Sequence, residues 1–191
     1  MRIYSHYSVQ TLSNVYLLGA ERSREAIIID PGCFDAPLLE LVEGNGYEIA
    51  AVLLTHAHSD EIPGLKTLLK VYETDIYAGV PRVFDRDAIA VGDDTELSIG
   101  SFSVRVRTIP AMSRDSVAYH IDRMLFPGRA LSAGLLGDVV SSFAHALLAD
   151  NVKDKILSLD DDTMILPYQG PPTTVGAERS FNRELRQESY L

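Results

Sequence analysis

The sequence is poor in two kinds of residue, and each scarcity limits what the protein can be. A single cysteine, Cys33, stands among 191 residues, which excludes an internal disulfide and any metal cluster held by several cysteines. Lysine and arginine number 17 against 27 aspartates and glutamates, for a formal net charge of −10. Because binding to phosphate backbones requires clustered Lys and Arg, this charge argues against nucleic acid as a general partner.

Long hydrophobic runs are also absent. No apolar run approaches the ~20 residues that a transmembrane helix needs, so we expect no contact with the membrane interior. Residues 1–5 lead directly into patterned sequence without the apolar core of a signal peptide, and we therefore expect a cytoplasmic protein. A hydrophobic content of 46% and a charged content of 23% are ordinary for a globular protein. We predict one domain over residues 1–191, a length that allows a sizeable core.

The patterning that is present places strands in groups, with helices between them. Apolar runs bounded by turn residues predict strands at 15–18, 26–29, 50–55, 76–79, 97–109, 117–121, 124–126 and 164–166. Helical patterns predict helices that start after Asp35, lie around 65–72, and cover about 138–149 and 174–188. Such an arrangement is typical of a layered α/β domain, and we expect two sheets sandwiched between helices.

The most informative segment follows the apolar run at 49–54. It reads Thr55-His56-Ala57-His58-Ser59-Asp60-Glu61, with two histidines one residue apart and a carboxylate two residues further on. Imidazole nitrogens and carboxylate oxygens are the usual protein donors to zinc. The carboxyl end of a buried strand is also where open α/β sheets place their ligands. His56, His58 and Asp60 are therefore candidate ligands for one divalent ion or for an adjacent pair.

Several segments follow one another in an order that is typical of a known family. They are Ser13-Asn14-Val15-Tyr16-Leu17-Leu18, Ile29-Asp30-Pro31-Gly32, Leu54-Thr55-His56-Ala57-His58-Ser59-Asp60 and the stretch from Asp161 to Thr174. Together they resemble the metallo-β-lactamase fold superfamily, and within it the small bacterial hydrolases akin to glyoxalase II. The resemblance covers nearly all of the chain. It implies an α/β fold, the metallo-β-lactamase-like αββα four-layer sandwich.

The chemistry that the resemblance implies needs seven ligand positions for two metal ions. The ions share a bridging water and a bridging Asp; one ion takes three His, and the other takes Asp and two His. The water becomes a hydroxide near neutral pH and attacks an ester, thioester or lactam carbonyl. In this sequence only His56, His58 and Asp60 keep donors at those positions.

The remaining four positions carry residues that do not suit the metals. Glu61 and Met112 stand where the family has His, Arg129 stands at the bridging Asp, and Gln169 stands at the last His. Met is a soft, weak donor, Gln is a poor zinc ligand, and Arg cannot be deprotonated in a protein. Arg129 is the decisive change, because a permanent cation and a metal pair exclude one another electrostatically. We expect Arg129 to form an ion-pair cluster with Asp60 and Glu61 that replaces the charge of the metals.

These departures predict a non-catalytic descendant of a glyoxalase-II-like hydrolase, with no catalytic residue and no cofactor, that serves as a binding, regulatory or assembly module. The alternative is an atypical hydrolase of ester or thioester substrates that holds one zinc, iron or manganese ion on His56, His58 and Asp60. The sequence identifies no partner, and a protein partner or a homo-oligomer remains open.

Cys33 follows a turn signature, and we favour a small buried or loop thiol over a nucleophile; His6 receives no role.

Overall fold

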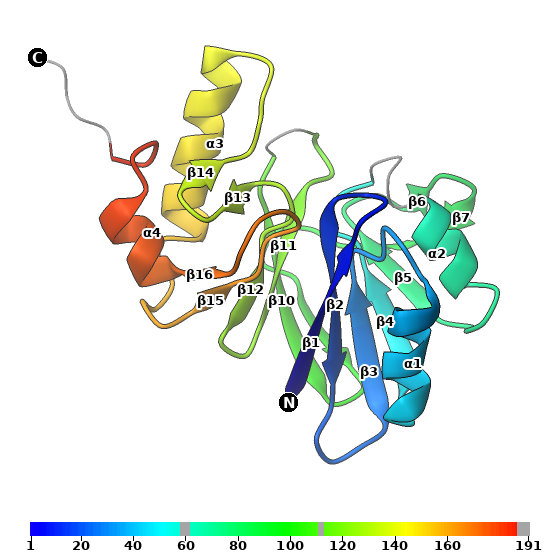
Figure 1. The fold of residues 1–191 in the computed structure, drawn as a ribbon. Helices are drawn as coiled ribbons and strands as arrows, with labels where there is room; N and C mark the ends of the chain where they lie inside the picture. The colour runs from blue at the N-terminus through cyan, green and yellow to red at the C-terminus, as the bar shows by residue number, and fades with distance from the viewer. Residues whose placement is uncertain (58–61, 111–112, 187–191) are drawn as a thin grey trace, which may run out of the picture.

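Two six-stranded sheets stand at the centre of the molecule in the computed structural model, with helices on their outer sides (Figure 1). The structure describes residues 1–57, 62–110 and 113–186. The strand order is β1-β2-β3-β4-β5-β8 in the first sheet and β16-β15-β12-β11-β10-β9 in the second. This arrangement confirms the αββα sandwich expected from the sequence.

The first sheet is built from the amino-terminal half of the chain. Its strands are β1 (Arg2–Ser8), β2 (Ser13–Gly19), β3 (Glu25–Ile29), β4 (Glu48–Leu53), β5 (Asp75–Ala78) and β8 (Ile89–Ala90). The strands from β3 to β8 are parallel, with α1 (Ala36–Gly44) between β3 and β4 and α2 (Ile62–Leu68) between β4 and β5. The carboxyl ends of β3 and β4 therefore meet at one edge, where the histidine loop begins.

The second sheet is mostly antiparallel and comes from the carboxyl-terminal half. Its strands are β9 (Glu96–Ile99), β10 (Phe102–Thr108), β11 (Val117–Ile121), β12 (Met124–Phe126), β15 (Met164–Ile165) and β16 (Thr173–Thr174). Helices α3 (Ser142–Lys155) and α4 (Val175–Phe181) cover its outer face. Two short hairpins complete the fold: β6 (Arg82–Val83) with β7 (Arg86–Asp87), and β13 (Leu131–Ser132) with β14 (Leu135–Leu136).

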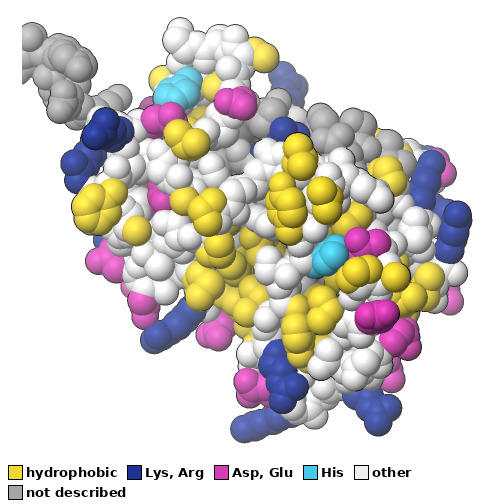
Figure 2. Space-filling model, viewed as in Figure 1, with side chains coloured by type: hydrophobic (Ala, Val, Ile, Leu, Met, Phe, Trp, Pro, Cys, Tyr) yellow, Lys and Arg dark blue, Asp and Glu magenta, His cyan; other side chains and the backbone are white. Residues whose placement is uncertain are grey.

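The buried side chains form three layers because both sheets are covered on both faces. Ile27 and Ile29 of β3 face the second sheet, whereas Ala26 and Ile28 face α1 and α2. All seven residues of β2 are buried, as expected of a strand in the middle of a covered sheet. In Figure 2, hydrophobic side chains gather in the middle of the visible face, and charged ones lie mainly around its periphery.

The predicted helix over 138–149 is displaced along the chain. The Ser141 side chain caps the helix by accepting a hydrogen bond from the backbone N–H of Ala144, so α3 starts later and runs to Lys155. Val140 and Phe143, which were expected on the apolar side, are 103% and 78% exposed. The buried residues lie one turn further on, at Leu148, Ala149 and Val152. Among the described residues, no helix is long and apolar enough to cross a membrane.

Candidate functional site

A buried carboxylate fixes the start of the histidine loop to the neighbouring strand. Asp30, just after β3, accepts hydrogen bonds at 2.8 Å from the backbone N–H and from the hydroxyl of Thr55. Asp30 is 2% exposed, and burial raises the pKa of its carboxyl to about 7, although both hydrogen bonds from Thr55 oppose the rise. Its φ of 50° is left-handed, a conformation that Asp tolerates better than most residues.

His56 lies at the junction of the two sheets. It is 7% exposed, and its Nδ1 is 2.9 Å from the hydroxyl oxygen of Thr55. Its ring packs edge-on against Tyr168, which follows β15, with ring centroids 4.9 Å apart and an interplanar angle of 83°. The first sheet therefore supplies the imidazole and the second sheet supplies the aromatic wall behind it.

The turn between β10 and β11 holds the same loop from the second sheet. The Asp115 carboxylate accepts a hydrogen bond of 2.9 Å from the backbone N–H of Ala57. The carbonyl of Thr55 accepts one of 2.8 Å from the backbone N–H of Val117. Asp115 was not singled out from the sequence; its place three residues after Met112, beside an expected ligand position, is the signal that could have found it.

Arg129 lies against the same aromatic ring as His56. Its guanidinium carbon is 5.7 Å from the centroid of the Tyr168 ring, within the range of a cation–π contact, and the side chain is half-buried. Within residues 1–57, 62–110 and 113–186, no carboxylate oxygen lies within 4.0 Å of its nitrogens. Asp60 and Glu61 lie outside the described residues, so the predicted ion-pair cluster stays a prediction.

Gln169 and Arg129 line one small cavity. The cavity has a volume of about 210 Å³, and Ser132 and Asp138 contribute further polar groups to its lining. The side-chain amide nitrogen of Gln169 donates to the carbonyl of Leu12, in the β1–β2 turn, at 3.3 Å. The structure thus brings together Arg129 and Gln169, two of the positions at which the resemblance implies metal ligands, beside the ring that contacts His56.

The described residues do not fit the pair of metal ions that the resemblance implies. Arg129 carries a permanent positive charge where the resemblance implies a bridging carboxylate. Gln169 supplies an amide, which hydrogen-bonds to a carbonyl, where the resemblance implies an imidazole. Of the family's ligand positions that are described, only His56 keeps a metal donor. The other predicted site residues lie outside the described part of the chain; they are His58, Asp60, Glu61 and Met112.

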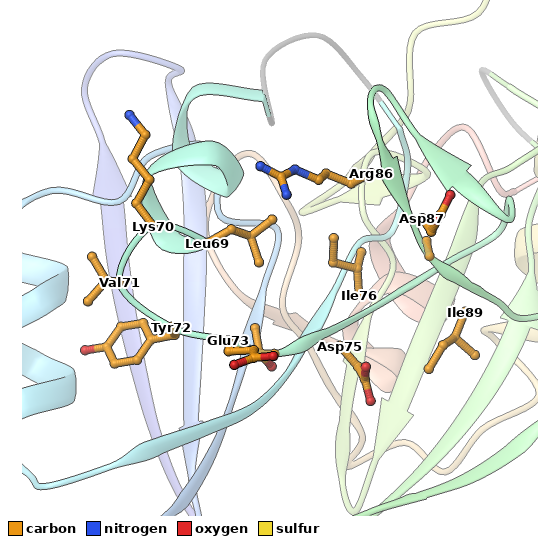
Figure 3. A pocket seen from close by; sticks show the side chains of 12 residues that line it. Leu69, Lys70, Val71, Tyr72, Glu73, Asp75, Ile76, Arg86, Asp87 and Ile89 are labelled. Atoms are coloured by element: carbon orange, nitrogen blue, oxygen red, sulfur yellow. The ribbon is translucent and has the colours of Figure 1, made fainter.

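Another cavity, of about 740 Å³, lies at the β5–β8 edge of the first sheet. It is lined by residues 69–76, which follow α2, and by residues 86–89. Figure 3 shows the Arg86 side chain reaching toward Leu69, while Lys70 points away. None of the predicted site residues lines this cavity, and its charged side chains are of both signs. It is therefore separate from the site around Arg129.

Comparisons with known sequences identify the family of this chain. A family model described as the metallo-beta-lactamase superfamily matches residues 9–169. An uncharacterized protein of Mycobacterium bovis is 31% identical, over 88% of this chain and 91% of that protein. The hydroxyacylglutathione hydrolase of Psychromonas ingrahamii is 34% identical, over 73% of this chain. The match spans only 58% of that hydrolase's length.

Solved structures show the same architecture. A B3 metallo-beta-lactamase, BLEG-1, superposes with a TM-score of 0.86 at 26% identity, over 96% of this chain and 99% of that one. ETHE1 from Myxococcus xanthus superposes with a TM-score of 0.86 over 96% of this chain and 84% of that one; at 22% identity this shows the fold alone. The chain therefore belongs to the metallo-beta-lactamase superfamily, and hydroxyacylglutathione hydrolases of the glyoxalase II type are among its relatives.

Proposed function

We propose that this chain is a non-catalytic member of the family whose former catalytic cleft binds an anionic ligand through Arg129. The observation that carries the proposal is the position of the Arg129 guanidinium, over the Tyr168 ring at 5.7 Å and in the lining of a cavity with Gln169. The resemblance implies metal cations at this point in the fold. A guanidinium supplies positive charge there without a metal.

Positive charge alone does not reproduce the hydrolysis that metals support. A metal ion lowers the pKa of bound water so that hydroxide is available near neutral pH, and it polarises the carbonyl under attack. A guanidinium is not a general base in proteins, so Arg129 cannot replace the metal-bound hydroxide. Binding is the part of the ancestral chemistry that this residue can still perform.

A carboxylate is the anion that best suits the site. The planar guanidinium presents paired N–H donors whose spacing matches the two oxygens of a carboxylate, and such charge-assisted bonds are strong. The cavity of about 210 Å³ takes one such group rather than a whole large molecule. Hydroxyacylglutathione, which the name of the relatives identifies as their substrate, carries carboxylates and is our candidate ligand. Binding without turnover suits a regulatory or assembly role.

Ligand titration with matched variants tests the binding half of the proposal. Hydroxyacylglutathione is titrated by calorimetry into the wild type, Arg129→Ala, Arg129→Lys and the control Arg123→Ala. Arg123 is an exposed arginine that pairs with Asp162 at 2.8 Å, outside the cavity lining. We expect Arg129→Ala to weaken binding by about tenfold or more, since a hydrogen bond to a charged group contributes ~1.5–3 kcal/mol. Arg129→Lys should lie between, and Arg123→Ala should match the wild type.

A hydrolysis assay with added zinc, iron or manganese tests the non-catalytic half. We expect no metal-dependent turnover of the same thioester above the protein-free rate. Turnover that requires metal and disappears in His56→Ala would overturn the proposal in favour of the single-metal hydrolase on His56, His58 and Asp60. Equal affinity in the wild type and Arg129→Ala would overturn the assignment of Arg129 as the binding residue.

A further inference from the structure

A second group of metal-donor side chains converges on the helix-covered side of the first sheet. His6 comes from β1, Cys33 from the loop after β3, and Asp35 from the residue that precedes α1. One ligand atom from each lies within 4.8 Å of the other two. Across residues 1–57, 62–110 and 113–186, no other set of three or more His, Cys, Asp or Glu side chains converges this closely. None of the three stands at a ligand position that the resemblance implies.

The distances within this group suit a small four-coordinate ion. His6 Nε2 lies 3.0 Å from Asp35 Oδ2, and Cys33 Sγ lies 4.0 Å from the same oxygen. Tetrahedral zinc, with bonds of ~2.0–2.3 Å to nitrogen, oxygen and sulfur, holds neighbouring donors about 3.4–3.6 Å apart. Reaching this spacing changes each of these two distances by roughly half an ångström. The third distance, from His6 Nε2 to Cys33 Sγ, is at most 4.8 Å and closes by up to about 1.2 Å.

The surrounding structure holds the three donors in place. Asp35 caps α1 with its other oxygen, Oδ1, which accepts from the backbone N–H of Leu38 at 3.2 Å, so Oδ2 remains directed at His6 and Cys33. The loop at Cys33 is pressed against α2, because a Cβ on Gly64 would lie 2.6 Å from the Cys33 backbone nitrogen. A preformed donor set loses little conformational freedom on binding an ion.

Burial around the group increases toward the thiol and leaves a route for an ion. Cys33 is 5% exposed and packs in the core under α1, and the His6 side chain is 15% exposed. The Asp35 side chain is 40% exposed, so an ion can enter from solvent past the carboxylate. The soft sulfur of Cys33 is the most buried donor, the imidazole of His6 is intermediate, and the hard carboxylate oxygen of Asp35 is the most exposed. Zinc accepts all three donor types.

We propose that His6, Cys33 and Asp35 bind one zinc ion, with a water molecule as the fourth ligand. On binding, the Cys33 thiol releases its proton to solvent and ligates as the thiolate. The ion joins edge strand β1 to the start of α1, so its effect is structural. The site shares no residue with the Arg129 cavity, so this proposal stands or falls independently of the proposed function.

Cobalt substitution provides a sharp test because the sequence has one cysteine. A thiolate-to-cobalt charge-transfer band in the near ultraviolet can therefore arise only from Cys33. We expect the protein to bind one cobalt ion with this band and to lose the band when zinc is added. Cys33→Ser should abolish the band, and His6→Gln should weaken zinc binding at least about tenfold.

Two further variants separate metal binding from helix stability and from the family's own site. Asp35→Asn keeps the cap on α1, because Asn is as good an N-cap as Asp, but it removes the anionic ligand and should weaken zinc binding. His56→Ala should leave the cobalt band unchanged. Zinc should raise the melting temperature of the wild type and not that of Cys33→Ser. Absence of the thiolate band, a band indifferent to His6→Gln, or zinc stabilisation that survives Cys33→Ser would each overturn the proposal.

Discussion

Asp30 is the residue on which the geometry of the histidine loop depends most directly. It lies after the last buried residue of β3, and both of its carboxylate oxygens accept hydrogen bonds from Thr55. Desolvation favours the neutral acid, whereas the two donated bonds favour the carboxylate, and the first effect is the larger. The charged form of Asp30 thus destabilises the folded protein, while its hydrogen bonds orient Thr55 next to His56.

The raised pKa of Asp30 predicts a pH-dependent stability. Because its folded pKa of about 7 exceeds the usual 3.8, the folded state binds the proton more tightly than the unfolded state between those values. This contribution is complete below about pH 4 and is lost as the pH rises through about 7. Asp30→Asn should remove it, so the variant should gain up to ~4 kcal/mol relative to the wild type between pH 4 and 8. Urea denaturation across this range measures the difference, and a constant difference contradicts the prediction.

Replacing Arg129 by alanine tests the prediction that an ion pair substitutes for the charge of the metals. The contact with Tyr168 alone accounts for ~0.5–2 kcal/mol. Removing one partner of a buried ion pair costs ~3–5 kcal/mol, because the other charge is stranded. If Asp60 or Glu61 pairs with the guanidinium in the ligand-free protein, Arg129→Ala should lower the free energy of unfolding by more than ~2 kcal/mol, and an anionic ligand must displace that carboxylate to bind. The control Tyr168→Leu removes the ring but keeps the charges of Arg129 and Glu61. A double-mutant cycle that combines Arg129→Ala with Glu61→Gln measures the interaction of the pair itself. A loss no larger than the ring contact would count against the pair.

At the scale of elements, the site is built where loops of the two sheets are pressed together. Gly64 lets α2 approach the Pro31–Cys33 loop, and Gly128 lets the loop after β12 approach Thr55. A Cβ at Gly64 would lie 1.7 Å from the carbonyl oxygen of Pro31, and one at Gly128 would lie 2.3 Å from the Thr55 hydroxyl oxygen. The absence of a side chain on these two glycines therefore determines how closely the elements pack.

Two glycine substitutions in helices should have opposite effects. Gly64→Ala should lower the free energy of unfolding by ~2–3 kcal/mol or more, because the new methyl group meets backbone atoms that cannot rotate away. Gly44→Ala, at the end of α1, has no atom within 4 Å of the new Cβ and should stabilise the protein by ~0.5 kcal/mol through helix propensity. Chemical denaturation of both variants measures the contrast. Equal effects would show that α2 can shift away from the loop.

On the scale of the whole molecule, the family's fold is retained, and we predict from the sequence that most of its metal ligands are replaced. The two sheets, their covering helices and the junction at His56 are present. Since backbone packing and ligand identity depend on different residues, one can change without the other.

Restoring the ligands should therefore restore metal binding. A variant that combines Glu61→His, Met112→His, Arg129→Asp and Gln169→His should gain zinc-dependent thermal stability, because an ion that binds only the folded state stabilises it. The measurement is made in a Cys33→Ser background, so that zinc at His6 and Asp35 does not contribute. Arg129→Asp alone should destabilise the protein without this gain, since it crowds like charges without a cation. A quadruple variant that folds but gains nothing would show that these four positions were assigned wrongly.

Local sequence pattern was sufficient to predict most strands and the start of α1, where the Asp35 cap was expected and is observed. It failed for β1, whose residues are mostly exposed or half-buried, so no apolar alternation marks this edge strand. It also placed α3 one turn too early, because Val140 and Phe143 continue the helical spacing of apolar residues without being buried by any neighbouring element. Pattern reports which residues are apolar, and burial depends on what packs against them.

The sequence by itself determined the family, because motif residues stand close together along the chain; its assignment of the changed ligand positions stays a prediction. Only the tertiary structure decided that Arg129 rests on Tyr168 and that Asp115 holds Ala57. The same is true of His6, Cys33 and Asp35, whose convergence depends on the pairing of β1 with β2 and of β2 with β3. Contacts between distant segments follow from sheet register and helix packing, which no short stretch of sequence encodes.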